Sequence, residues 1–211
     1  MAERWTGRRV KPAEAEQISG IRDVRFLDAF EGELQKLLES GNYGTCYLDL
    51  FHTAPQDIAR PAHYLAQQLK ARWPELEIPD ACAILRYLRT IKSPEEIQAL
   101  REAEKKTKAG ILAMMQASKP GMYEYQYKAE FDRALGQFGP EGPGFPSIIS
   151  AGANNFCIHY YGYTGQAQDG DMILNDVGAQ HNNMITDVSR GWPCNGKFTQ
   201  RQKLLYECAL A

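Results

Sequence analysis

Two aspartates, Asp176 and Asp187, flank a short polar turn in the stretch NDVGAQHNNMITDVSR, residues 175–190. A hairpin with a two-residue turn at His181 and Asn182 would set these aspartates directly opposite each other on neighbouring strands. Opposed residues have Cβ atoms about 4.5–5.5 Å apart, and two like charges at that distance destabilise the pairing. A divalent cation between them removes the repulsion, and carboxylate oxygens suit Mg, Mn or Zn. The spacing therefore favours a metal site.

The same spacing also fits a half-exposed hairpin with two hydrated aspartates, one of them helping to form the turn. Leu174, Val177 and Val188 would make the surroundings apolar, which raises the cost of leaving the carboxylates without a cation. Two carboxylates remain an incomplete site, because such ions take roughly four to six ligands. His159, on the expected strand 156–163, is the best further candidate, although a lone histidine on a strand is more often structural.

The elements that would position these residues form an α+β arrangement. Ser93, Pro94 and Glu96 are three agreeing start signals for a helix that runs to about Ala117. A second helix with one apolar face follows over 123–138. The period then changes to short β-rich segments separated by Gly, Asn and Asp, at 147–152, 156–163, 170–179 and 184–192. Helices followed by neighbouring strands predict helices packed on an antiparallel sheet.

A smaller α/β unit is expected before these helices. Apolar residues at helical spacing predict a helix over 23–40, and the apolar run 45–51 has the length of a strand. A helix is expected over 57–73. The segment 81–89 fits a strand or a helix, and we favour a strand that leads into a linker.

Composition excludes several functional classes. The 211 residues are 44% hydrophobic and carry 24 basic and 26 acidic residues without a basic run, which disfavours nucleic acid and anionic membrane surfaces as partners. No stretch approaches the roughly 18 apolar residues of a membrane span, so we expect a cytoplasmic protein. Five cysteines without CxxC spacing argue against a disulfide framework and a thiolate zinc site.

Several motifs follow one another in a specific order: IKSPEEIQALREA, KPGMYEYQY, FPSIISAGANN, IHYY, DGDMILNDVGA, TDVSRGWPCNGKFT and LLYECAL. With them the sequence from Ile91 onward resembles the pita-bread metallopeptidases, and most closely the Xaa-Pro aminopeptidases. The resemblance implies that 1–90 is the later part of a creatinase-like N-terminal domain. It also implies that 91–211 is the N-terminal half of a pita-bread catalytic domain.

The resemblance also implies a cofactor and a reaction. Such enzymes hold two divalent ions, commonly Mn with Co, Zn or Mg as alternatives, on two aspartates, one histidine and two glutamates. Asp176 and Asp187 match the two aspartates, and His159 matches a catalytic histidine that contacts the substrate without binding metal. The implied reaction removes the N-terminal residue from short peptides with proline at the second position, by attack of a metal-bridging hydroxide.

The remaining metal ligands of the family lie well after the second aspartate, and no histidine follows His181 in these 211 residues. We therefore expect the chain to be incomplete alone, and to act as a homodimer or with a separate C-terminal half. The alternative interpretations are a non-catalytic pita-bread module that binds peptides or partners, and an inactive truncated fragment.

Overall fold

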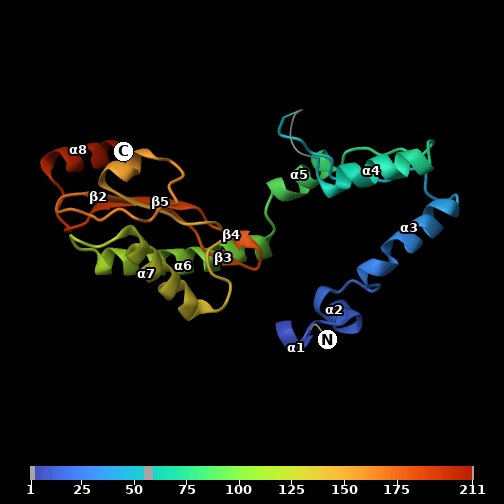
Figure 1. Cartoon of the computed structure of the whole chain (residues 1–211), viewed down its shortest axis with the longest axis horizontal. Helices are drawn as coiled ribbons and strands as arrows, with labels where there is room; N and C mark the ends of the chain where they lie inside the picture. The colour runs from blue at the N-terminus through green and yellow to red at the C-terminus, as the bar shows by residue number, and fades with distance from the viewer. Residues whose placement is uncertain (1–2, 55–58, 211) are drawn as a thin grey trace. The chain divides into compact units, whose positions relative to one another are not determined.

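The computed structural model describes residues 3–54 and 59–210, and the chain divides after Ile91 into two compact units. Figure 1 labels the elements of both. The first unit is helical, with five α-helices and one 3-10 helix in its described part: α1 (Glu3–Thr6), α2 (Pro12–Ser19), η1 (Leu27–Ala29), α3 (Phe30–Glu39), α4 (Pro61–Arg72) and α5 (Cys82–Thr90). Two isolated parallel bridges, Thr45 with Glu77 and Leu48 with Asp80, supply its β-structure.

The helices of this unit differ from the expected ones at their ends. The helix expected over 23–40 begins as the 3-10 turn η1 and becomes α-helical at Phe30. The expected start of the next helix at 57 lies outside the described residues, and α4 begins at Pro61, the first-turn position that tolerates a missing N–H. The expected strand 45–51 is reduced to the two isolated bridges.

The strand favoured for 81–89 is wrong, because this segment forms α5. The Asp80 carboxylate accepts a hydrogen bond of 2.9 Å from the backbone N–H of Cys82, which satisfies one of the free donors at the start of the helix. The segment contains leucines and arginines, which lose little side-chain freedom in a helix. The period of a short apolar run does not show whether the run forms a helix or a strand. Here the segment is a helix, and the bond from Cys82 to Asp80 lies at its N-terminus.

The second unit packs two helices on a three-stranded antiparallel sheet. The helices are α6 (Pro94–Ala117) and α7 (Glu124–Leu135), followed by the 3-10 turn η2 (Gly136–Phe138). The sheet has the order β1 (Ile148–Ala151), β2 (Met172–Val177) and β5 (Val188–Pro193), with β2 in the centre. Between β2 and β5 the chain forms a second, two-stranded ladder of β3 (Gln180–His181) and β4 (Met184–Ile185).

The start of α6 is the one that the sequence predicts. The Ser93 hydroxyl accepts a hydrogen bond of 3.2 Å from the backbone N–H of Glu96, and the Glu96 carboxylate accepts one of 2.8 Å from the backbone N–H of Ser93. Pro94 occupies the first turn. This reciprocal capping box satisfies two backbone donors that a helix start leaves free.

One face of the sheet, together with α6 and α7, forms the core of this unit. Side chains alternate along β2, so that Ile173, Asn175 and Val177 are buried while Leu174 and Asp176 face the other way. The buried face packs against Met114 of α6 and against Tyr127 and Phe131 of α7, with further core residues Ile111, Leu135, Ile149, Ala151 and Trp192. Gly110 allows Phe131 to lie against α6, since a Cβ there would be 2.4 Å from the Phe131 ring.

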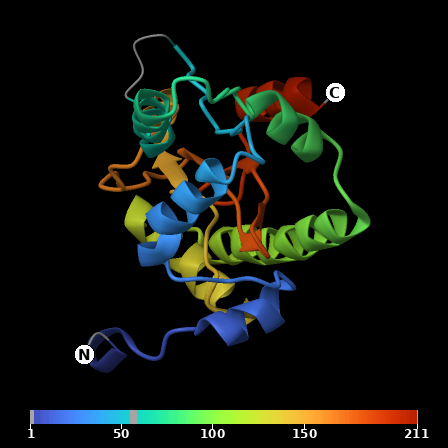
Figure 2. The ribbon, with the colours of Figure 1, turned by 90° about the vertical axis from the view of Figure 1, so that its right-hand side faces the viewer.

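The other face of the sheet is accompanied by α8 (Gln200–Leu210), which Figures 1 and 2 show on the side opposite α6 and α7. Its leucines Leu204, Leu205 and Leu210 are more than 60% exposed. No helix in the described ranges 3–54 and 59–210 is long and apolar enough to cross a membrane.

Candidate metal centre

The hairpin that connects β2 to β5 has a turn one residue later than expected. Gln180 pairs with Ile185 and His181 with Met184, so the two turn residues are Asn182 and Asn183. Both have left-handed backbone angles, with φ of 48° and 63°. Two consecutive left-handed residues characterise the type I′ turn, whose twist matches that of a hairpin, and Asn adopts this conformation more easily than His.

This shift changes the partner of Asp176. In the sheet Asp176 lies opposite Ser189 and Val177 opposite Val188, so the prediction that Asp176 and Asp187 form a directly opposed pair is wrong. A shift of one residue in the turn moves every cross-strand partner by two. Asp187 instead lies two positions before Ser189, just ahead of β5, in a diagonal relationship to Asp176.

The two carboxylates nevertheless meet, because diagonal neighbours on one face lie about 7–8 Å apart at Cα and their side chains bridge the remaining distance. A hydrogen bond with Asp176, together with the repulsion between the two negative charges, raises the pKa of the Asp187 carboxyl. The Ser189 hydroxyl donates a hydrogen bond of 2.9 Å to Oδ1 of Asp176 and orients it. The two aspartates therefore form a pair that gains from a cation.

The chemistry of this pair fits part of a hard-metal site. Asp176 is half-buried and Asp187 is exposed, so neither residue is enclosed by the fold. Carboxylate oxygens are ligands that Mn, Mg and Zn accept. Within residues 3–54 and 59–210, however, no three His, Cys, Asp or Glu side chains come together as a metal-binding group. The described residues thus bring together two candidate ligands, fewer than the roughly four to six that such an ion takes.

His159 does not lie on a strand, contrary to the expectation for 156–163. The segment follows the 3-10 turn η3 (Gly152–Phe156) as irregular chain, and its backbone leaves the extended region at Tyr163, with φ of 54°. Its composition is typical of a strand, but local side-chain bonds shape it, such as the 3.0 Å bond from Asn154 Nδ2 to the Tyr160 hydroxyl. The exposed His159 ring stacks on Tyr161, with ring centroids 6.4 Å apart.

Glu124 anchors the segment that carries His159, and sequence reasoning did not identify it. Its fully buried carboxylate accepts three hydrogen bonds: 2.8 Å from the Ala151 N–H, 2.9 Å from Asn154 Nδ2 and 2.7 Å from the Gly165 N–H. Such a carboxylate replaces its lost hydration by these donors. The bonds tie both ends of the segment 151–165 to the first turn of α7.

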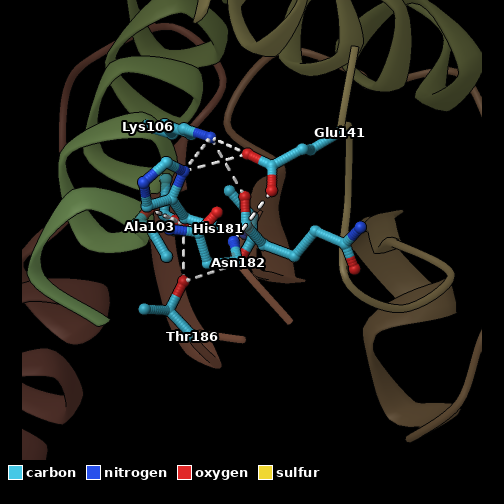
Figure 3. A network of polar contacts seen from close by, with 9 residues as sticks. Ala103, Lys106, Glu141, His181, Asn182 and Thr186 are labelled. Atoms are coloured by element: carbon cyan, nitrogen blue, oxygen red, sulfur yellow. Dashed lines mark hydrogen bonds and ion pairs between the residues drawn. The ribbon is translucent and has the colours of Figure 1, made fainter. Parts of the chain in front are cut away.

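A second polar network, drawn in Figure 3, joins α6 to the tip of the hairpin. Lys106 Nζ lies 2.5 Å from Oε2 of Glu141, 3.1 Å from Nδ1 of His181 and 3.2 Å from the carbonyl of Gln180. The Glu141 carboxylate also accepts a bond of 2.8 Å from the Asn182 N–H. Hydrogen bonds from Lys106, His181 and Asn182 lower the pKa of Glu141 to about 2.

A pocket of about 370 Å³ lies beside the carboxylate pair on the outer face of the sheet. The pocket is lined by residues of the sheet, among them Leu174, Ser189 and Gly191, and by Tyr206 and Leu210 of α8. Ser189 is also the hydrogen-bond donor to Asp176, so the pocket adjoins the candidate metal centre. Its size and mixed lining are compatible with a small peptide or with side chains of another polypeptide.

The chain is similar to known peptidases along its whole length. It is 30% identical to the Xaa-Pro aminopeptidase of Escherichia coli K12, over 99% of this chain and 48% of that protein. A putative aminopeptidase P from Bacillus anthracis superposes with a TM-score of 0.91 at 34% identity, over 99% of this chain and 50% of that one. A zinc-substituted E. coli aminopeptidase P in complex with product gives 0.84 at 27% identity, again over 99% of this chain and 48% of the other.

The chain thus spans about half the length of the curated relatives that it matches. Its arrangement of helices on an antiparallel sheet is that of half of a pita-bread fold. The sequence profile of metallopeptidase family M24 matches residues 98–211, which include Asp176, Asp187 and His159. The chain therefore belongs to metallopeptidase family M24.

Proposed function

We propose that this chain supplies the first half of a divalent-metal site in an M24 aminopeptidase, with Asp176 and Asp187 as metal ligands. The observation that carries the proposal is the approach of these two carboxylates on one face of the sheet, where each gains from a shared cation. Membership of M24 and similarity to Xaa-Pro aminopeptidases support a reaction in which the N-terminal residue before proline is removed. Residues 1–90 would belong to an N-terminal domain and 91–211 to the first half of the catalytic domain.

The proposed cofactor is a pair of divalent ions, commonly Mn, with Co, Zn and Mg as alternatives. When bound, such ions supply an activated water and stabilise the negative charge that develops on the scissile carbonyl. Asp176 and Asp187 would hold them through carboxylate oxygens, and the Ser189 hydroxyl would keep one oxygen of Asp176 in place. We assign to His159 a hydrogen bond to the substrate carbonyl, a role that its exposed ring leaves open.

The remaining ligands would come from outside the described residues, because only two carboxylates meet here. We propose that a second copy of the chain or a C-terminal half supplies them and covers the outer face of the sheet. The exposed leucines of α8 and the pocket beside Ser189 support this, since a large apolar surface next to a site commonly marks an interface. If a second copy supplies them, light scattering should report an assembly larger than 23.8 kDa, whereas a folded monomer would rule out the second copy and leave the C-terminal half.

A second candidate is a non-catalytic module that binds peptides or partners. The observation that favours it is that no three-residue group of metal-ligand side chains occurs in the part of the chain that the structure describes. Such a module would bind an Xaa-Pro peptide without releasing its first residue, with or without metal.

One experiment separates these candidates. The purified 211-residue chain is incubated with a short Xaa-Pro peptide and with the matched Xaa-Ala peptide, in Mn²⁺ or in chelator. Under the proposed function, the chain binds Mn²⁺ and loses this binding in Asp176→Asn, and any release of the first residue requires Mn²⁺ and prefers proline at the second position. Binding of the peptide, unchanged by chelator, by a chain that binds no Mn²⁺ would support the non-catalytic module and overturn the proposed metal site.

A further inference from the structure

The carboxylate pair lies beside a gap between two ladders of hydrogen bonds. The β2–β5 ladder ends where Val177 pairs with Val188, and the β3–β4 ladder starts where Gln180 pairs with Ile185. Between them lie residues 178–179 on one segment and 186–187 on the other, so Asp187 itself is a gap residue. One backbone hydrogen bond of 3.1 Å, from the Thr186 N–H to the Ala179 carbonyl, crosses this gap, and Asp187 itself has no partner in either ladder.

Thr107 of α6 adds a side-chain contact to both segments of the gap. Its side chain is buried, at 1% exposed, and its hydroxyl oxygen accepts a hydrogen bond of 2.8 Å from the Ala179 N–H. The same oxygen lies 2.7 Å from the hydroxyl of Thr186. Ala179 and Thr186 belong to the two opposite segments of the gap, so one hydroxyl joins both of them to the helix.

The bonds of Thr107 exceed what a buried threonine in a helix needs. Such a threonine usually satisfies its hydroxyl on a carbonyl of its own helix, and Thr107 makes that bond too, at 3.0 Å to the Ala103 carbonyl. The two additional bonds run to residues 72 and 79 positions further along the chain. Figure 3 shows this group of polar contacts between α6 and the hairpin.

The neighbouring residue Lys106 holds a different part of the hairpin. Its ammonium bonds to Glu141 and to the carbonyl of Gln180, which are contacts at the tip beyond the gap. Thr107 acts closer to the carboxylates, because Thr186 directly precedes Asp187 and Ala179 follows Asp176 by three residues. A rigid helix of 24 residues thus holds the tip through one side chain and the gap through the next.

We propose that Thr107 is a positioning residue for the metal centre, whose hydroxyl sets the separation of the Asp176 and Asp187 carboxylates. This inference deepens the proposed function and rests on its metal site. Thr107 touches neither metal nor substrate, and it acts through the backbone on both sides of the gap. Groups hydrogen-bonded directly to metal ligands change metal affinity by about 10–100-fold when they are replaced, and Thr107, which acts through the neighbouring backbone, should fall near the lower end of this range.

The test measures Mn²⁺ affinity of the 211-residue chain by electron paramagnetic resonance of free Mn²⁺, alongside circular dichroism and thermal unfolding. Thr107→Val keeps the shape of the side chain and removes the hydroxyl, and we expect its Mn²⁺ affinity to fall by about tenfold or more. Thr107→Ser keeps the hydroxyl and should largely restore the affinity. Rescue by the conservative variant distinguishes a role of the hydroxyl from a loss of packing.

Ser118→Ala is the matched control. The Ser118 hydroxyl also links α6 to the sheet, since it accepts a bond of 3.0 Å from Trp192 Nε1 and donates one of 3.0 Å to the Cys194 carbonyl. These partners lie at the far end of β5 from Asp187. Ser118→Ala should therefore lower thermal stability without changing Mn²⁺ affinity.

Folded Thr107→Val that binds Mn²⁺ like the unchanged chain would overturn the inference and leave the proposed function standing. If Thr107→Val fails to fold, Thr186→Val removes the same hydroxyl contact from the other side. A lowered Mn²⁺ affinity in Thr186→Val would then support the inference, and an unchanged affinity would overturn it. Mn²⁺ binding that is unaffected by Asp176→Asn would overturn the proposed metal site, and the positioning role with it.

Discussion

The backbone of Thr186 passes so close to Gly178 that a Cβ on residue 178 would lie 1.6 Å from the Thr186 carbonyl oxygen. Gly178 is the last residue of the Asp-Val-Gly sequence that begins with Asp176, and Thr186 directly precedes Asp187. The glycine therefore permits the close crossing of the two segments that carry the carboxylates. No side chain can occupy this position without moving the Thr186 backbone.

Gly178→Ala is expected to destabilise the chain by more than about 4 kcal/mol or to prevent folding, because the clash is with backbone and cannot be relieved by a rotamer change. Urea unfolding followed by circular dichroism measures the effect. Gly191→Ala is the matched control in the same sheet, since its Cβ would meet nothing closer than 3.4 Å. Equal unfolding midpoints for the two variants would contradict the crossing described here.

The turn at Asn182 and Asn183 can be tested by exchange of one residue. Asn183 has a φ of 63°, a conformation that glycine adopts without strain and that costs a β-branched residue roughly 1–2 kcal/mol. Asn183→Gly should keep or raise the free energy of unfolding, and Asn183→Val should lower it by about that amount. The turn would lie elsewhere if Asn183→Val proved neutral in the same urea experiment.

Glu124→Gln tests the anchor of the segment with His159. The substitution places an NH₂ group among three N–H donors, so at least one buried donor loses its acceptor, at a cost of about 1–3 kcal/mol. Hydrogen exchange of the Ala151 and Gly165 amides should accelerate together with the loss of stability. Glu130→Gln on the same helix is the control, because its ion pair with Arg133 is largely exposed and contributes at most about 1 kcal/mol. Amide protection that survives in Glu124→Gln would argue against the anchor.

The Glu141 network predicts a pH dependence. The pKa of Glu141 is lowered to about 2, mainly by the hydrogen bond from Lys106, against about 4.3 for a free glutamate. A lowered pKa in the folded state stabilises the fold above the unfolded value and loses this contribution as the pH falls. The unfolding midpoint should therefore drop between about pH 4.3 and pH 2, and Glu141→Gln should reduce the drop. Superimposable pH profiles for the two proteins would rule out this contribution.

Features encoded by neighbouring residues could be predicted from the sequence. Ser93, Pro94 and Glu96 specify the start of α6 because their bonds are local, and alternation along β2 and the change of period after α7 indicate the sheet. The two aspartates could be selected as a pair because a hairpin between them places them on neighbouring strands. Their diagonal geometry could not be predicted. A turn at His181 and Asn182 and a turn at Asn182 and Asn183 fit the sequence equally well, and they differ by only one residue.

The unpredicted features depend on contacts between distant residues. Glu124 finds its donors 27 to 41 residues away, and Thr107 finds Ala179 and Thr186 still further along the chain. The residues next to Glu124 and Thr107 in the sequence do not indicate these partners. The segment 156–163 has the composition of a strand, yet its backbone is irregular. Glu124 anchors this part of the chain, and Asn154 is hydrogen-bonded to Tyr160. His159 was expected on a strand and lies outside the sheet, and its catalytic role stays a prediction.

The proposed metal centre requires that Asp176 and Asp187 bind the same metal ion. A double-mutant cycle of Mn²⁺ affinity, with Asp176→Asn, Asp187→Asn and the double variant, measures this most directly. Ligands of one ion are coupled, so each single substitution should lose nearly as much affinity as the double variant. Independent, additive losses, or an affinity that neither substitution changes, would contradict the metal centre.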